Sequence, residues 1–272
     1  MPSLDLLSIA REVKHAQDHA LALTPFTARY ADFDIPAAYE VARLVHEQRL
    51  ADGIKPVGRK IGFTNSAIWE QYGVGHPVWA YVYNTTVIQT SSNQATCQLS
   101  RFVAPRIEPE IIVHFHSKPT VTTDLSKILE CIDWIASGFE IVQSHFADWK
   151  FAAADTIANS GLHACLLVGK QCNVASLGLD VIQKLEQFSL SIHRNDQLLE
   201  VGCGSNVLGN PLSALAHLLT TIARQPNALQ IDAGEIVTTG TVTKAYPIAS
   251  GEVWGTHLEG IALSGLSVTF TN

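Results

Sequence analysis

Two glutamates, Glu108 and Glu110, are the residues whose type and spacing best suit chemistry. Side chains alternate between the two faces of a strand, so both carboxylates point to one side if this stretch is extended. Such charges repel unless one is protonated or a cation lies between them, and an all-oxygen pair suits a hard divalent ion. The spacing therefore indicates a metal site. The alternative is a solvated face of an edge strand, where Pro109 would be tolerated.

A third carboxylate, Glu140, lies inside a short apolar run at residues 139–142. Burying a glutamate in such a run is costly unless it has a partner. We therefore expect Glu140 to be the third ligand beside Glu108 and Glu110. The alternative is a strand-face glutamate in water.

A lysine, Lys60, lies between Gly58 and Gly62. Glycine permits close approach of the backbone, so this lysine can sit deep in a cleft. Partial desolvation would lower its pKa and make the amine usable as an acid or a base. The alternative is an ordinary surface lysine.

Composition restricts the class of protein. The 272 residues are 47% hydrophobic and 16% charged, which is typical of a compact globular chain and compatible with burial of surface in a homo-oligomer. A net charge of −7 excludes the basic footprint that nucleic acid requires. No apolar run of about 18 residues could span a bilayer. The N-terminus lacks a secretory pattern and the five cysteines form no C-x-x-C pair, so we expect a cytoplasmic protein without disulfides.

The helices and strands that must position these side chains are predicted from the spacing of apolar residues and from the glycine, proline and capping residues that bound each run. Helical spacing over residues 4–23 and 36–50 predicts an N-terminal α-helical cap. Further helices are predicted at 66–73, at 122–138 and, most clearly, from Pro211 onwards, with strands between them and towards the C-terminus. The fold class is therefore mixed α/β and strand-rich. We place the helical cap, with the Lys60 strand, at residues 1–85 and a mixed β-rich metal-binding core at residues 86–272.

Seven short motifs in order along nearly the whole chain resemble the fumarylacetoacetate hydrolase superfamily, and within it the 2-oxopent-4-enoate hydratase and 4-oxalocrotonate decarboxylase branch. They are RKIGFT at 59–64, GV at 73–74, RIEPEI at 106–111, GFEIV at 138–142, DTIANSG at 155–161, VLGNP at 207–211 and TGT at 239–241. Each is weak alone, but their combined order is specific. The resemblance implies a mixed β-roll or barrel core, like the C-terminal domain of that superfamily, behind the helical cap.

The resemblance also implies a divalent metal, Mg²⁺ or alternatively Mn²⁺, held by the carboxylates at Glu108, Glu110 and Glu140. It makes Lys60 a catalytic residue that moves protons beside the metal. The implied activity is a lyase reaction on a small unsaturated 2-oxo acid, as in 2-hydroxypenta-2,4-dienoate hydratase. Alternatives are a 4-oxalocrotonate-type decarboxylase or tautomerase, an acylpyruvate C–C hydrolase, or a non-catalytic partner subunit.

Four further residues are predicted to bind the substrate: Arg106, Ser160, Thr239 and Trp79. Each also has a structural alternative. Arg106 would balance the charge of the glutamates, Ser160 would form a turn, Thr239 would end a strand, and Trp79 would pack in the core. One departure from the resemblance stands out, because related hydratases carry an aspartate after the proline at position 77. Here that position is Val78. If the aspartate moves a proton, another carboxylate such as Asp155 would have to replace it.

Overall fold

The computed structural model describes residues 4–65, 69 and 74–272. The helix predicted at 66–73 lies outside these residues, apart from position 69. Among the described helices, none combines the length and apolar character needed to cross a bilayer.

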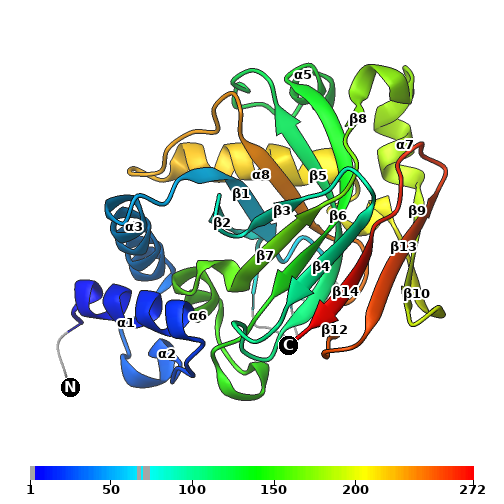
Figure 1. Ribbon diagram of the computed structural model, residues 1–272. Coiled ribbons are helices and arrows are strands. Elements are labelled where there is room, and N and C mark those ends of the chain that lie inside the picture. Colours follow the sequence, from blue (N-terminus) through cyan, green and yellow to red (C-terminus); the bar gives the residue numbers. More distant parts are fainter. Residues whose placement is uncertain (1–3, 66–68, 70–73) are drawn as a thin grey trace.

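The N-terminal helices form the predicted cap. They are α1 (Leu6–His19), α2 (Phe26–Arg29) and α3 (Ile35–Ala51), joined later in the chain by α6 (Ala153–Ala158). Asp5 and Asp34 cap α1 and α3 by accepting backbone N–H donors from Ser8 and Ala37. Apolar side chains from all four helices pack together in one cluster, and Figure 1 shows these helices gathered at one side of the molecule.

A mixed nine-stranded sheet forms the centre of the core, in the order β2-β1-β11-β5-β6-β7-β3, with β12 paired to β5 and β8 paired to β6. Its strands are β1 (Pro56–Gly62), β2 (Val78–Tyr83), β3 (Val87–Gln89), β5 (Arg106–Phe115), β6 (Ile132–Val142), β7 (His163–Val168), β8 (Cys172–Asn173), β11 (Ile236–Thr241) and β12 (Tyr246–Pro247). Strands β2 and β3 lie at opposite ends of this order but are consecutive in the chain. A turn in which Thr86 N donates to Tyr83 O joins them, so the sheet curls back on itself.

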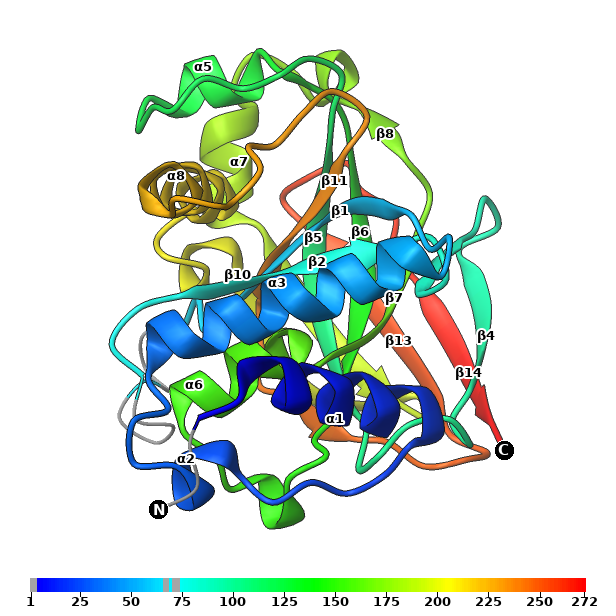
Figure 2. The same cartoon turned by 90° about the vertical axis from the view of Figure 1, so that its left-hand side faces the viewer.

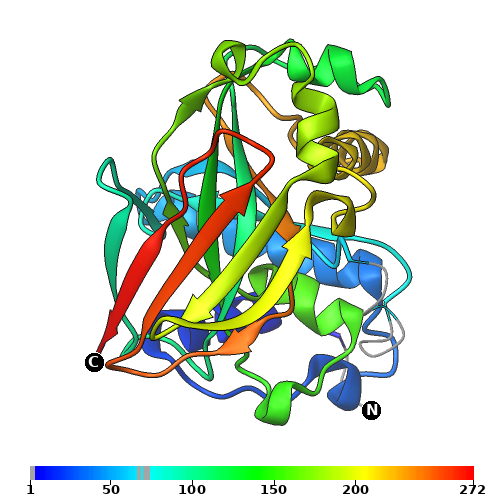
Figure 3. The same cartoon turned by 90° about the vertical axis from the view of Figure 1, so that its right-hand side faces the viewer.

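A second, five-stranded sheet packs against this one, in the order β10-β9-β13-β14-β4. Its strands are β4 (Gln94–Gln98), β9 (Ser189–Arg194), β10 (Gln197–Cys203), β13 (Val253–Glu259) and β14 (Ser267–Thr271). Figure 3 shows β9, β10, β13 and β14, from yellow to red, across the front of the molecule, with β4 in blue-green beside the red strand. Together the two sheets confirm the strand-rich, mixed α/β class.

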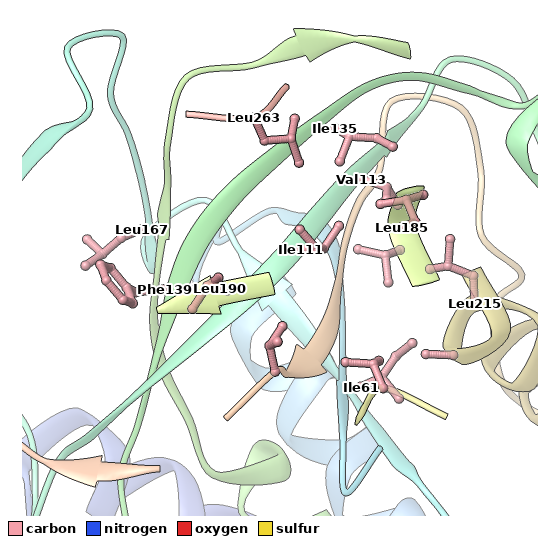
Figure 4. Packing of buried hydrophobic residues seen from close by; sticks show 14 of the residues in the cluster. Ile61, Ile111, Val113, Ile135, Phe139, Leu167, Leu185, Leu190, Leu215 and Leu263 are labelled. Carbon is pink, nitrogen blue, oxygen red and sulfur yellow. The ribbon is translucent and has the colours of Figure 1, made fainter. Parts of the chain in front are cut away.

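The largest apolar cluster fills the space between the sheets and the remaining helices, α5 (Leu125–Leu129), α7 (Val181–Gln187) and α8 (Pro211–Arg224). Figure 4 shows side chains of the central sheet, such as Ile111 and Phe139, beside Leu185 of α7, Leu190 of β9 and Leu215 of α8. Ile112 points to the opposite, concave face of the sheet, where a smaller apolar cluster lies. The sheet is therefore buried on both faces, which rigidly supports side chains that project from it.

The structure bears on two sequence predictions, the helix at 122–138 and the division after residue 85. The helix predicted at 122–138 ends at Leu129, and Ile132 and Ile135 belong to β6, because pairing with strands on both sides outweighs a helical spacing that short apolar runs also satisfy. The predicted division after residue 85 does not coincide with a break in the sheet. Strands β1 and β2 pair within the same sheet as β5, so Lys60 is carried by the core sheet.

Candidate metal centre

Three glutamates meet where β5 and β6 run side by side. Glu108 lies directly opposite Glu140 in the antiparallel register, and Glu110 lies opposite Gly138. One carboxylate oxygen from each glutamate lies within 4.8 Å of those from the other two. The structure therefore brings the three predicted ligands to one point on the concave face of the sheet.

The edge-strand alternative for Glu108 and Glu110 is wrong, because β5 lies between β11 and β6. Proline is tolerated in this central strand because Pro109 lies just beyond a β-bulge in β11 between Thr238 and Thr241. There Val242 N donates to Pro109 O, while Val242 O accepts from Asn206 Nδ2 and needs no N–H from position 109. This bulge also places two hydrogen-bond donors beside Glu110. Thr238 Oγ1 donates to Glu110 Oε2, and Gly240 N donates to the same oxygen at 2.8 Å.

One carboxylate oxygen in the cluster, Glu110 Oε1, is buried without a hydrogen-bond partner among the residues that the structure describes, and Glu140 Oε2 has the Lys60 ammonium beside it, at 3.1 Å. A buried, unpartnered polar atom is costly and calls for an explanation such as a bound ion. Three carboxylates whose oxygens lie within ligand distance of one another, with one oxygen otherwise unsatisfied, fit a hard divalent cation. We conclude that these residues form a fitting divalent-metal site.

Lys60 is the positive charge beside this cluster. Its side chain is almost fully buried, and Nζ donates to Gly161 O at 2.8 Å and lies 3.1 Å from Glu140 Oε2. Burial lowers the pKa of Lys60, but the three glutamates raise it by more, so the net pKa is raised. The sequence expectation of a lowered lysine pKa is therefore wrong for the metal-free cluster, where Lys60 is a charged ammonium.

The carboxylates respond unequally to this environment. Burial raises the pKa of Glu108 to about 7 and that of Glu110 well above its usual value, in spite of Lys60. Burial also raises the pKa of Glu140, but Lys60 and His163 together outweigh it and hold that pKa below its usual value. Without a metal, the cluster therefore holds protons on part of its carboxylates, and a cation would displace them.

His163 is a site residue that sequence reasoning missed. Its Nδ1 lies 2.8 Å from Glu140 Oε1 and its Nε2 lies 2.9 Å from Thr86 Oγ1, which fixes the ring between β6 and β3. A lone histidine at the start of an apolar strand gives no signal of this. The contact depends on the irregular pairing of β6 and β7 near Val142.

The residues predicted to bind substrate lie at different distances from the cluster. The Thr239 hydroxyl is buried and donates to Ile111 O at 3.0 Å, so it takes part in the sheet. Arg106 lies close enough to Glu108 to lower its pKa, with its guanidinium 4.0 Å from the Trp149 ring centroid. Ser160 precedes Gly161, and its Oγ accepts from Gln17 of α1 at 3.0 Å.

Trp79 points away from the glutamates. Its Nε1 donates to Gln225 Oε1 at 3.0 Å, its ring stacks on Tyr39, and it lines a separate cavity. Asp155 cannot replace the absent aspartate in this structure. Its carboxylate is fully buried and accepts hydrogen bonds from Thr27 and Ala152, which anchor α2 to α6.

Val78 stands beside Lys60. An added Cβ on Gly62 would lie 3.3 Å from Lys60 Nζ and 3.6 Å from Val78 Cγ2, so the lysine and the valine flank the same glycine. Val78 is buried among apolar side chains of the cap. The position therefore presents methyl groups in place of the carboxylate that the resemblance led us to expect.

No protein-family model matches the chain. It is 26% identical over 253 residues to the 2-keto-4-pentenoate hydratase of Paraburkholderia xenovorans (strain LB400), which covers 93% of this chain and 90% of that enzyme. It is 27% identical over 251 residues to the 4-oxalocrotonate decarboxylase of Pseudomonas sp. (strain CF600), with 91% of this chain and 90% of that enzyme covered.

Solved structures show the same fold. The 4-oxalocrotonate decarboxylase of Pseudomonas putida G7, complexed with magnesium and adipate, superposes with a TM-score of 0.89 at 24% identity and covers 99% of this chain and 100% of its own. The fumarylpyruvate hydrolase of Pseudomonas aeruginosa, in complex with Mn²⁺ and pyruvate, gives a TM-score of 0.56 at 12% identity over 78% of this chain and 88% of its own. The resemblance described from the motifs is confirmed, together with the fold it implied.

Proposed function

We propose that this chain is a divalent-metal-dependent lyase that acts on a small unsaturated 2-oxo acid, in the manner of a 2-hydroxypenta-2,4-dienoate hydratase. The observation that carries the proposal is the cluster of three glutamates, with Glu110 Oε1 buried and unpartnered, beside a buried lysine. Relatives that are named as hydratases and match over nine-tenths of both chains support it. We further propose Mg²⁺ as the natural ion, a cytoplasmic location and a homo-oligomer.

The chemistry follows from charge. When bound, a divalent cation stabilises negative charge that develops on the 2-oxo oxygen and the adjoining carboxylate of such an acid. Lys60, oriented by Gly161 O, can hold a proton at Nζ and deliver it to a neighbouring substrate carbon or oxygen. Thr238 and Gly240 keep Glu110 oriented while this happens.

A decarboxylase is the second candidate, and Val78 favours it. Addition of water needs a group that positions or deprotonates the water, whereas loss of CO₂ needs only stabilisation of the electrons left behind. Apolar methyl groups beside Lys60 suit the second requirement better. Relatives named 4-oxalocrotonate decarboxylase match the chain as fully as the hydratases do.

The test follows the ultraviolet absorbance of 2-hydroxypenta-2,4-dienoate and of 4-oxalocrotonate with purified protein. We expect one of them to be consumed with Mg²⁺ or Mn²⁺, and the rate to vanish with a chelator. Lys60→Met should lower the rate by about 10²–10⁴-fold, the usual range for loss of a proton-transfer group. If neither compound reacts while the metal still binds, the lyase proposal fails for these substrates and the non-catalytic subunit gains support.

A further inference from the structure

A cavity of about 590 Å³ lies between α3, strand β2 and the C-terminal end of α8. Figure 2 shows α3 crossing in front of β1 and β2, with α8 on the same side of the sheet. One wall is aromatic. Trp79 and Tyr81 project from β2, and Tyr39 of α3 stacks on Trp79 with ring centroids 5.8 Å apart.

This cavity reaches the lysine side of the metal centre. Ala80 and Ser160 line it, and the residue after Ser160 is Gly161, whose carbonyl accepts from Lys60 Nζ. An added Cβ on Gly161 would lie 3.0 Å from Lys60 Cδ and 3.3 Å from Ala80 Cβ. Gly161 therefore packs against both Lys60 and Ala80, which are cross-strand neighbours on the face of β1 and β2 opposite Trp79 and Tyr81. Its lack of a side chain leaves room beside the lysine, next to Ser160 on the cavity wall.

The charged groups around the cavity are mostly neutralised within the protein. Arg43 pairs with Glu40 and Glu47 on the same helix. Arg59, behind the aromatic wall, pairs with Glu235 at 2.6 Å and lies 4.0 Å from the centroid of the Tyr81 ring.

Three other basic groups line the cavity: His217 and Arg224 of α8, and the exposed His76. Burial lowers the pKa of His217, which disfavours its charged form, and Arg224 lies on the exposed rim. The interior of the cavity therefore offers aromatic surface, and it lacks a buried cation free to receive a carboxylate among the residues that the structure describes.

We propose that this cavity holds the far end of the substrate, and that this end is a planar apolar group, such as an aryl ring, rather than hydrogen, methyl or a second carboxylate. The inference rests on the proposed function, because the 2-oxo acid end must lie at the metal centre. The volume fits: ligand pockets commonly measure about 300–1,000 Å³, far more than the tail of a five-carbon acid requires. Stacked aromatic walls favour a planar group.

The test compares two 2-oxo acids that differ only in the tail, 2-oxobutanoate and 4-phenyl-2-oxobutanoate, by titration calorimetry in the presence of Mg²⁺. We expect the phenyl compound to bind at least tenfold more tightly. Ala42→Phe, which adds a ring to the wall of the cavity, should abolish this difference. Ala51→Phe adds the same bulk at the exposed end of the same helix and should leave the ratio of the two affinities unchanged.

Thr221→Phe, on α8 at the opposite wall, provides a second blocking variant, and Mg²⁺ affinity reports whether each variant is folded. Equal affinities of the two acids in the wild type, or a folded pair of blocking variants that keep the difference, would overturn the inference while leaving the lyase proposal intact. Binding of the phenyl compound that does not depend on Mg²⁺ would make the cavity a separate site and would also overturn it. If neither acid binds and no dienoate is consumed, the proposed function itself fails.

Discussion

At the scale of single residues, Glu140 is the centre of the charge network. It faces Glu108 across the strand pair, lies 3.1 Å from the Lys60 ammonium and contacts His163 through its other oxygen. These two basic partners keep its pKa low while those of the other two glutamates are raised. The pKa values of the three proposed ligands are thus unequal before a metal binds, and Glu140 is the glutamate that is ionised most readily.

His163 should act as a positioning residue for Glu140. We expect His163→Ala to weaken Mg²⁺ affinity by about 10–100-fold, the usual effect of losing a group that orients a metal ligand. His163→Gln, whose side-chain N–H can still donate to Glu140, should restore part of the Mg²⁺ affinity. His114→Ala is the matched control, because it removes a histidine–carboxylate contact, to Asp133 at 2.6 Å, from the same sheet but outside the glutamate cluster. Equal Mg²⁺ affinity in the alanine variant, by calorimetry, would contradict this role.

The sequence was sufficient to name the three glutamates and the lysine, since alternation along a strand and flanking glycines are local signals. It was not sufficient to find His163, or the partners of Glu110. Those contacts join positions far apart in the chain, such as Glu110 and Thr238, and depend on which strands pair. Val78 illustrates a third case, in which the residue is visible in the sequence but its place beside Lys60 is not.

At the scale of elements, the bulge in β11 positions Glu110, one of the three proposed metal ligands. The bulge depends on Gly240, which has φ +101° and donates its N–H to Glu110. An added Cβ there would lie 1.8 Å from Thr64 Oγ1, and Thr64 is itself buried. A segment in this conformation has no distinctive sequence pattern, so its effect on the site could not have been predicted from the sequence.

Gly240→Ala should therefore destabilise the protein and weaken metal binding together. The matched control is Gly234→Ala, at φ +89° with open space around the new methyl group. Both variants incur the left-handed backbone cost of about 1–2 kcal/mol. Only Gly240→Ala adds overpacking, for a further ~1–3 kcal/mol. Urea unfolding measures the difference, and equal losses in the two variants would show that the contact with Thr64 is unimportant.

At the scale of the whole molecule, a metal that binds only the folded chain should stabilise it. We expect about 2.7 kcal/mol of added stability at a Mg²⁺ concentration one hundred times the dissociation constant, seen as a higher Tm. Glu140→Gln should remove most of this increase, because it removes a ligand. Sodium chloride at matched ionic strength separates specific binding from screening. An identical Tm increase in the glutamine variant would contradict the assigned ligands.

Two buried histidines should contribute a loss of stability in mild acid, opposite in sign to the contribution of Glu108 and Glu110, whose pKa values are raised. Burial lowers the pKa of both His46 and His145 from 6.5 to about 4. The unfolded chain then binds more protons than the folded one between these values, so stability is lost as the pH falls from about 6.5 towards 4, by on the order of 1–3 kcal/mol for each histidine.

His46→Phe should reduce this loss while keeping the ring stacked on Tyr81, whose centroid lies 3.7 Å away. His257→Phe, at an exposed position, controls for the removal of a histidine. Urea midpoints at pH 7 and pH 5 provide the measurement. A pH dependence in His46→Phe that is the same as in the wild type would show that this residue does not contribute.

The pairing of β1 with β11 has a consequence for folding order. Glu108 and Glu140 come from strands that are close in the chain, whereas Lys60 is aligned with Thr238, near the opposite end. Contacts between distant segments form slowly, because closing a long loop costs entropy before any contact is gained. A refolding chain should therefore assemble the Glu108–Glu140 pair first and receive its lysine last. During synthesis, too, the lysine leaves the ribosome long before the strand that aligns it.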